Sequence, residues 1–216
     1  MLELAFNSGR NKTLEILCIG AHCDDIEIGC GAALMRLADE RPISITWVIL
    51  TSTPRRVAEA RKSARLILRH ARRSNVQIAS FRDGFLPAQW AAVKEYFETL
   101  KLLPRPGIIF THVLDDLHQD HRVASELTWN TFRDHLILEF EIPKFDGGLT
   151  QPNFYVPVSR RIVDRKCRQL HQAYVSQRGK AWFDSETFRG LMRLRGLECN
   201  APDGYAEAFH ARKVRL

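Results

Sequence analysis

The chain has 216 residues, which is the length of one domain with a sizeable buried core. Its 45% hydrophobic and 26% charged residues are typical of a soluble globular protein, and no apolar run approaches the roughly 20 residues that span a bilayer. The formal net charge of +7 would suit a nucleic acid or an anionic substrate, but the arginines are scattered along the chain, which favours an ordinary solvated surface.

The five cysteines also limit the class of protein. Their number is odd and no two show Cys-x-x-Cys spacing, so we expect no disulfide framework, and a reducing compartment fits better. The N-terminal residues 1–12 lack the basic-then-apolar order of a signal peptide. We therefore expect a cytoplasmic protein with no membrane span.

Strands and helices alternate over the first half of the chain. Short apolar runs predict strands over residues 14–20, 43–50, 76–79 and 108–111. Helical spacing of apolar residues predicts helices over 29–37, 57–71 and 88–103, with a turn at 82–84 before the last of them. This alternation predicts an α/β fold in which helices cover both faces of a mostly parallel sheet.

The second half of the chain is less regular. Its pattern predicts, in order, a helix over 123–133, a strand over 136–142, a short strand over 154–159 and a helix over 161–174. Residues 143–153 contain several glycines and prolines and form a loop that is long enough to cover a binding site.

Two polar segments each follow a predicted strand. The segment AHCDD (21–25) follows the first strand, and the run THVLDDLHQDH, which contains HQDH (118–121), follows the fourth. Ligands of such sheets bind outside the carboxyl ends of the strands. The two segments are far apart in the sequence, but we expect them to meet at one rim of the sheet.

The first segment offers ligands of the kind that zinc prefers. A zinc site in a hydrolase takes three ligands from histidine and carboxylate and leaves one position open. His22 and Asp25 stand three positions apart just past a strand end and can turn toward one point, while Asp24 between them is free to hold a proton. A lone His-x-x-Asp is more often a surface pair or a helix cap than a metal site.

The second segment adds His118 and His121, again three positions apart, with Asp120 between them. If a helix starts here, both histidines can share one face of its first turn. His112 is a further candidate for supporting the site, but an ordinary buried histidine explains it equally well. Because both segments reach the same rim, together they favour a metal site in a zinc-dependent hydrolase.

Four stretches resemble one known family. AHCDDIEIGCGA (21–32) resembles the first signature of the LmbE/PIG-L family of N-acetylglucosaminyl deacetylases, usually written AHPDD before a glycine-rich helix start, and LHQDHR (117–122) resembles the second. The stretches RVAE (56–59) and FRDGFLP (81–87) give weaker support. The resemblance spans about residues 14–125 and continues more loosely to the pair Ser176-Gln177.

The resemblance implies a fold, an activity and a role for each site residue. The fold would be a Rossmann-like three-layer sandwich, as a single domain over 1–216 with its core at about 14–125 and the part 126–216 completing the site. The activity would be hydrolysis of the acetamide of an N-acetylglucosamine-like sugar or conjugate, with Zn²⁺ or another divalent metal. The resemblance implies that His22, Asp25 and His121 are zinc ligands and that Asp24 is the general base. It implies that His118 stabilises the oxyanion or donates a proton, and that Asp120 orients this histidine. It also implies that Arg56 and Asp83 contact sugar hydroxyls. The expected partner is a small N-acetylated amino sugar or glycoconjugate, and relatives of this kind often form homo-oligomers.

Cys23 departs from the resembled signature, which has proline at this position. Proline fixes φ, so its loss is expected to loosen the ligand loop. The cysteine also adds a thiol beside the expected metal, which would open a route to oxidative or heavy-metal inactivation.

Two other classes of protein compete with the hydrolase. A nucleotide-binding Rossmann module would explain Gly29-Cys30-Gly31 after the first strand, but position 34 is leucine where the fingerprint has its third glycine. A nucleic-acid-binding protein would explain the basic helix over 55–73. A solvated outer face explains that helix better, and we expect no nucleic-acid partner.

Overall fold

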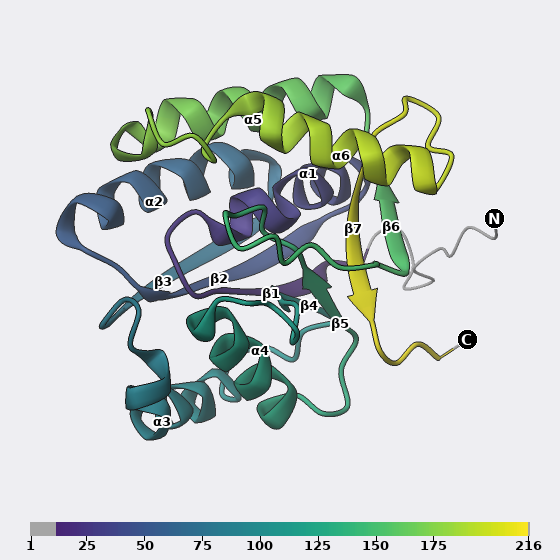
Figure 1. Ribbon diagram of the computed structural model, residues 1–216. Coiled ribbons are helices and arrows are strands. Elements are labelled where there is room, and N and C mark those ends of the chain that lie inside the picture. The colour runs from purple at the N-terminus through teal and green to yellow at the C-terminus, as the bar shows by residue number, and fades with distance from the viewer. Residues whose placement is uncertain (1–11, 216) are drawn as a thin grey trace.

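A computed structural model describes residues 12–215 of the chain (Figure 1). The strands are β1 (Leu14–Gly20), β2 (Ile43–Thr51), β3 (Arg73–Phe81), β4 (Ile108–His112), β5 (Ile137–Phe140), β6 (Phe154–Pro157) and β7 (Ala206–Ala211). The α-helices are α1 (Asp25–Glu40), α2 (Pro54–Ile67), α3 (Trp90–Leu100), α4 (Gln119–Thr131), α5 (Arg160–Ala173) and α6 (Ser185–Glu198). Residues 1–11, on which the reading of the N-terminus rests, and residue 216 lie outside the described residues. Within 12–215, no helix is both long and apolar enough to cross a membrane.

One seven-stranded sheet runs through the molecule in the order β3-β2-β1-β4-β5-β7-β6. Strands β1 to β5 pair in parallel, and β7 pairs antiparallel with both β5 and β6. The strand order reverses at β1, because β2 and β3 extend the sheet on one side and β4 and β5 on the other. Parallel sheets bind ligands at such a switch point. The two polar segments leave β1 and β4, the pair of strands on either side of it.

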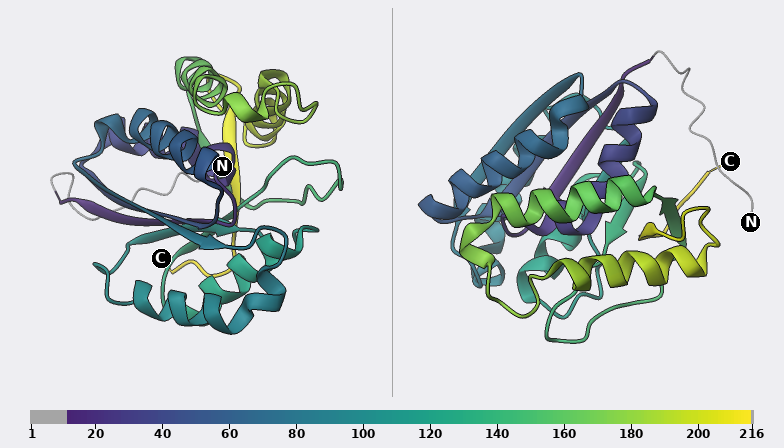
Figure 2. Two further views of the ribbon diagram at one scale, coloured as in Figure 1. Left: turned by 90° about the vertical axis from the view of Figure 1, so that its left-hand side faces the viewer. Right: turned by 90° about the horizontal axis from the view of Figure 1, so that it is seen from above.

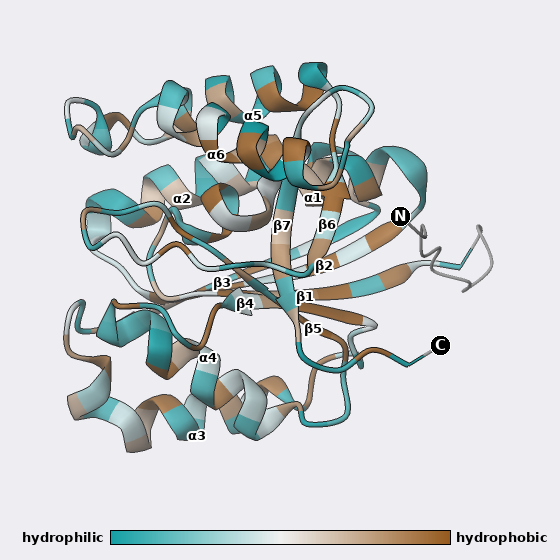
Figure 3. Cartoon of the chain, turned by 45° about the vertical axis from the view of Figure 1, so that its right-hand side comes forward, coloured by the Kyte–Doolittle hydropathy of each residue, from teal (hydrophilic) through white to brown (hydrophobic). Residues whose placement is uncertain are grey.

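Helices cover both faces of the sheet, as the sequence predicts (Figures 1 and 2). Helices α1, α2, α5 and α6 lie on one side, and α3 and α4 lie on the other. Hydrophobic and hydrophilic residues alternate along α5 and α6 (Figure 3), because each helix buries only one stripe. The predicted three-layer α/β fold is confirmed, and the antiparallel edge formed by β6 and β7 is an addition to it.

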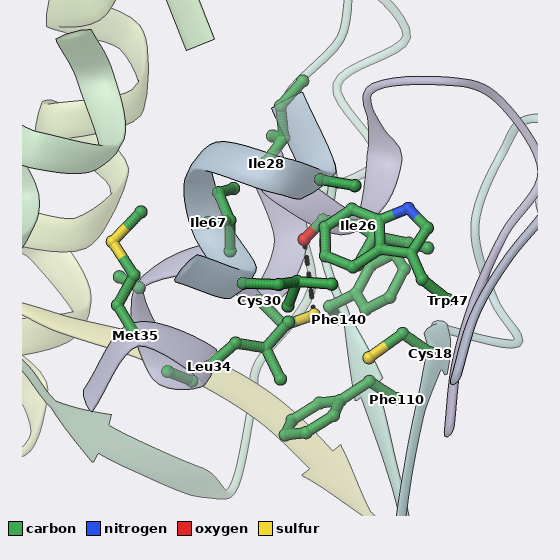
Figure 4. Close-up of a cluster of buried hydrophobic side chains, with 14 of the residues drawn as sticks. Cys18, Ile26, Ile28, Cys30, Leu34, Met35, Trp47, Ile67, Phe110 and Phe140 are labelled. Atoms are coloured by element: carbon green, nitrogen blue, oxygen red, sulfur yellow. Dashed lines mark hydrogen bonds between the residues drawn. The ribbon is translucent and has the colours of Figure 1, made fainter. Parts of the chain in front are cut away.

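The core beneath α1 packs Cys30 and Leu34 of the helix against Cys18, Phe110 and Phe140 of the sheet (Figure 4). Cys30 and Cys18 are fully buried near Trp47, Phe110 and Phe140. The Cys30 thiol donates to the Ile26 carbonyl at 3.3 Å. All five cysteines are buried and free, so their role in the fold is that of small hydrophobic residues.

Several helices begin earlier than the apolar pattern predicts, and two of these differences matter for the site. The predicted helix 29–37 begins at Asp25, and the predicted helix 123–133 begins at Gln119 with His118 as its N-cap. Polar residues of the first turns carry no apolar periodicity, so the pattern missed them. Helix α6 and strand β7 were not predicted at all.

A buried ion pair ties α1 to the C-terminal part of the chain. The Glu207 carboxylate accepts from the N–H groups of Ala32 at 2.9 Å and Ala33 at 2.7 Å. Lys166 donates at 2.6 Å both to Glu207 and to the Ile28 carbonyl, which the Ala32 N–H would use in a regular helix. Lys166 of α5 and Glu207 of β7 therefore both hydrogen-bond to main-chain groups of α1 and hold the helix in place.

Two glycines of α1 allow a direct test of this packing. A Cβ atom at Gly29 would overlap the ring of Phe140, whereas one at Gly31 would lie 3.4 Å from its nearest neighbour, a methyl group of Ile67. We expect Gly29→Ala to lower the free energy of unfolding by about 1–3 kcal/mol, because overpacking strains the core. Gly31→Ala, the matched control, should be neutral or stabilise by up to about 1 kcal/mol through helix propensity. Urea denaturation measures both, and equal stabilities of the two variants would contradict the packing described here.

Candidate metal centre

The loop that carries AHCDD is fixed at Ala21 by the two strands that flank β1. The Ala21 N–H donates to His112 Nε2 at 3.0 Å, and the N–H and hydroxyl of Thr51 both donate to the Ala21 carbonyl at 2.8 Å. All three residues are fully or almost fully buried. Since His112 ends β4 and Thr51 ends β2, these bonds place the loop at the carboxyl edge of three adjacent strands.

Three of the predicted ligands converge beside this loop. His22 Nδ1 lies 3.2 Å from Asp25 Oδ2 and 3.1 Å from His121 Nε2, and Asp25 Oδ2 lies 3.6 Å from His121 Nε2. Ligand atoms about 2.1 Å from a tetrahedral zinc ion are about 3.4 Å apart, so these atoms are spaced like three corners of such a site. The residues present therefore fit a divalent metal.

In both His22 and His121, the ring nitrogen that does not face the other ligands lies next to a carboxylate. His121 Nδ1 donates to Asp116 Oδ2 at 2.9 Å, and His22 Nε2 lies 3.1 Å from Asp83 Oδ1. Metal-binding histidines usually donate their outer N–H in this way, which fixes the ring and leaves the other nitrogen for the metal. Sequence reasoning missed Asp116, although an acidic pair shortly before HQDH was an available signal.

Charge in the cluster favours the binding of a cation. Burial lowers the pKa of His121 to about 3, so its ring is neutral and offers a lone pair. Burial would also lower the pKa of His22, but the charge of Asp25 and hydrogen bonds to three carboxylates raise it well above its usual value. Burial opposes the ionisation of Asp25, yet the neighbouring histidines hold its pKa well below the usual range. The site is thus rich in ionised carboxylate.

Other trios share these residues. Within residues 12–215, three further trios also place one ligand atom each within 4.8 Å of one another. They are His22 with His118 and His121, Asp25 with His112 and His121, and His22 with Asp83 and Asp120. His112 is a weaker ligand candidate, because its Nε2 already accepts the Ala21 N–H and its ring stacks on His121 with the centroids 3.8 Å apart. His112 is therefore a buried histidine that also supports the site.

Asp24 lies next to the ligands but faces a different partner. Its Oδ1 pairs with Arg56 Nη2 at 2.8 Å, and its Oδ2 has no hydrogen-bond partner within residues 12–215. Burial raises the pKa of Asp24, while the charge of Arg56 opposes this rise. Arg56, which the resemblance assigns to the substrate, thus holds one oxygen of Asp24 and leaves the other free to accept a proton.

His118 and Asp120 interact through the main chain. His118 Nδ1 accepts the Asp120 N–H at 3.2 Å, so the neutral ring carries its proton on Nε2, and burial lowers the pKa of His118. The Asp120 carboxylate points elsewhere and accepts from the N–H groups of Gly84 at 2.7 Å and Leu86 at 3.1 Å. The peptide group of Asp120 therefore orients His118, and its side chain fixes the turn that carries Asp83.

Cys23 is held in place without the proline ring of the resembled signature. Its thiol donates to the Thr51 carbonyl at 3.6 Å, and its own carbonyl accepts from the Tyr174 hydroxyl. Tyr174 Oη also lies 2.6 Å from Glu27 Oε1, and burial raises the pKa of Glu27 to about 8. Partners distant in the sequence stabilise the loop that we expected to be loose.

The burial of Cys23 also removes the expected route to oxidation. Burial raises the pKa of the Cys23 thiol to about 12, and the thiolate is the reactive form. Cys23 therefore adds a small buried side chain beside the ligands rather than a reactive group.

Thiol labelling tests this description of Cys23. The folded protein should react far more slowly with iodoacetamide at pH 8 than the unfolded protein, because all five cysteines are buried. Cys18, Cys23 and Cys30 lie on one tryptic peptide (13–36), so fragment-ion mass spectrometry of that peptide would assign the label to Cys23. Labelling of Cys23 in the folded protein at the rate of the unfolded chain would contradict its burial.

Comparisons with solved structures agree with this fold. The conserved protein TT1542 from Thermus thermophilus is 24% identical, with 94% of this chain and 96% of that chain covered and a TM-score of 0.71. N,N′-diacetylchitobiose deacetylase from Pyrococcus horikoshii is 18% identical over 91% of this chain and 83% of its own, with a TM-score of 0.72. GalB, the 4-carboxy-2-hydroxymuconate hydratase from Pseudomonas putida, is 15% identical over 94% and 98%, with a TM-score of 0.73. At these identities the likeness shows the fold alone, and a fold does not fix a reaction.

Sequence comparisons are more specific. A curated relative, the uncharacterized deacetylase YaiS from Escherichia coli (strain K12), is 52% identical over 52 residues, which are 24% of this chain and only 28% of that protein. The family described as PIG-L, GlcNAc-PI de-N-acetylase, matches residues 17–132, a range that contains both polar segments. The chain belongs to the PIG-L family of deacetylases.

Proposed function

We propose that this chain is a zinc-dependent hydrolase that removes the acetyl group from an N-acetylglucosamine-like sugar or its conjugate. The observation that carries the proposal is the cluster of three ligand atoms next to Asp24, a buried aspartate with one unpartnered oxygen among the residues described. The family description names a de-N-acetylase, and one protein with this fold is a diacetylchitobiose deacetylase. Both names describe removal of acetyl groups from acetylated amino sugars, which supports the proposed substrate class.

His22, Asp25 and His121 would hold the metal. Zinc is the first choice because two imidazoles and one carboxylate form a common donor set of zinc hydrolases, and another divalent ion is the alternative. Teicoplanin deacetylase Orf2, which shares this fold at 13% identity and a TM-score of 0.68, has a zinc-inhibited form, which supports zinc binding by this fold and makes the working ion a question for experiment. When bound, such an ion polarises an amide carbonyl and makes water acidic near neutral pH.

Asp24 would act as the general base. Its free Oδ2 takes the proton of the attacking water, while Arg56 holds Oδ1 and keeps the carboxylate oriented. A pKa raised by burial makes Asp24 a stronger base than an exposed aspartate. Having taken this proton, Asp24 can pass it to the leaving amine, which completes the release of acetate and a free amino sugar.

His118 would stabilise the negative charge that develops on the acetamide oxygen. Its Nδ1 accepts a peptide N–H, so a neutral His118 directs an N–H donor from Nε2. The lowered pKa of His118 favours this neutral donor over a charged acid. Loss of one such donor typically costs about 2.7–4 kcal/mol of transition-state stabilisation.

Arg56 and Asp83 remain the proposed contacts to the sugar. The Asp83 side chain is 66% exposed although one oxygen lies close to His22, so it can reach a hydroxyl group from the rim of the site. Arg56 keeps 20% of its side chain exposed while it pairs with Asp24. We further propose one domain over residues 1–216, because Tyr174 and Lys144 from the second half contact the site formed by the first half.

Two substitutions separate the roles of base and ligand. Asp24→Asn should keep the metal and lower kcat by about 10²–10⁴-fold, the usual contribution of a general base. His121→Ala should lose the metal itself, because it removes one of three protein ligands. Metal analysis of the purified variants together with turnover measures both effects. Near-normal turnover of metal-loaded Asp24→Asn would show that another group is the base.

A substrate screen tests the proposed reaction directly. The purified protein should release acetate from at least one N-acetylated sugar, glycoside or nucleotide sugar, and a chelator such as EDTA should abolish the release. Added Zn²⁺, or another divalent ion, should restore it. Acetate release that persists with the chelator would contradict the metal mechanism. Hydration of an unsaturated acid without deacetylation would favour a reaction like that of GalB instead.

A further inference from the structure

Asp116 is a buried carboxylate with three donors. It accepts from His121 Nδ1 at 2.9 Å and from the His118 N–H at 2.7 Å. Lys144 Nζ lies 2.9 Å from Oδ1 and 3.1 Å from Oδ2. The Asp116 side chain is 1% exposed, so its charge depends on these partners. Two of the donors follow Asp116 within five positions, but Lys144 comes from a different part of the chain.

Lys144 lies in the connection between Phe140, the end of β5, and Phe154, the start of β6. Figure 1 shows this connection as a long loop. This connection is held against the segment 116–118 at a second point, because a Cβ atom at Gly148 would lie 3.1 Å from the side chain of Leu117. Farther on, the Thr150 N–H donates to Glu141 at 2.8 Å. The loop over 143–150 is therefore anchored on both sides of its tip, and Lys144 is its polar contact with the metal site.

We propose that Lys144 is a positioning residue of the metal site, which holds Asp116 in place so that Asp116 fixes the ring of His121. The inference rests on the proposed function, since it takes His121 as a metal ligand. Without Lys144 a buried carboxylate loses its only cationic partner among residues 12–215 other than histidine. An unpaired buried charge is unfavourable, so Asp116 turns toward water or the loop moves away. In both cases His121 loses the partner that aims its Nε2.

A simple effect of charge has the opposite sign, which makes the proposal testable. Lys144 is a cation close to the site, and its removal alone would favour the binding of a second cation such as Zn²⁺. Loss of the orientation of His121 would weaken zinc binding instead, because the supporting partners of metal ligands typically contribute about 10–100-fold in affinity. The direction of the change in zinc affinity therefore distinguishes positioning from bulk electrostatics.

The experiment compares Lys144→Met with Lys144→Arg in the full chain. Competition with a chromophoric chelator gives the zinc dissociation constant, and the visible spectrum of the Co²⁺-loaded protein reports ligand geometry. We expect Lys144→Met to bind zinc about tenfold more weakly, the lower end of the range for such partners, and to shift the Co²⁺ bands. Lys144→Arg should restore most of the affinity, because a guanidinium can bridge both oxygens of a carboxylate.

Arg122→Met is the matched control, because Arg122 Nη1 donates to the main-chain carbonyls of Asp116 at 2.9 Å and Leu117 at 2.8 Å but does not contact the Asp116 carboxylate. It should bind zinc like the wild type. In an Asp116→Asn background, Lys144→Met should cause no further loss, which keeps the test valid if the single variant folds poorly.

Tighter or unchanged zinc binding by Lys144→Met would overturn the positioning role, as would equal losses in Lys144→Met and Arg122→Met. A wild-type protein that binds no zinc and no Co²⁺ would instead overturn the proposed function on which the inference rests. Thermal midpoints of the metal-free variants separate a loss of the ligand geometry from a loss of the fold.

Discussion

The candidate metal centre depends on how the main chain of one residue, Ala21, is held between two strands. Its N–H is bound by His112 from one side of the sheet and its carbonyl by Thr51 from the other, while the strand that carries it ends between them. These three hydrogen bonds hold the start of the ligand loop directly after β1 ends at Gly20. They turn His22 and Asp25 over the switch point, where His121 arrives from β4.

Charge balance is the second constraint on this site. The carboxylates of Asp25, Asp83 and Asp120 lie close to His22, and the carboxylate of Asp116 contacts His121. All four except Asp83 are buried. Arg56 pairs with Asp24 and Lys144 pairs with Asp116, so each of these cations neutralises one acid next to the ligands. Among residues 12–215, the carboxylates of Asp25, Asp83 and Asp120 form no salt bridge with lysine or arginine and pair only with histidine side chains. Such a distribution suits a bound dication and would be unfavourable for a purely structural polar cluster.

Local signals in the sequence predicted most of the sheet and the candidate ligands, since both depend on short patterns. The strand after which His22 follows and the spacing of HQDH are visible in stretches of fewer than ten residues. Partners that reach the site from far along the chain are not visible in this way. The acidic pair at residues 115–116 is a weak sequence signal for Asp116. Lys144 and Tyr174 have no such signal, because a lysine in a loop and a tyrosine after a helix are common features with no specific role. Helix α1 was placed too late for a related reason, since its first turn is polar where it forms the site.

The contact of Glu207 with α1 can form only after almost the whole chain has been synthesised. The Glu207 carboxylate adds to the hydrogen bonding of α1 across a separation of 175 residues, and α1 begins with Asp25. A nascent chain can form β1, the ligand loop and α4 long before Glu207 leaves the ribosome, but two amides in the middle of α1 then lack this acceptor. The contacts of α1 are therefore complete only when β7 has been made, and a change at Glu207 acts on the helix that begins within the first polar segment.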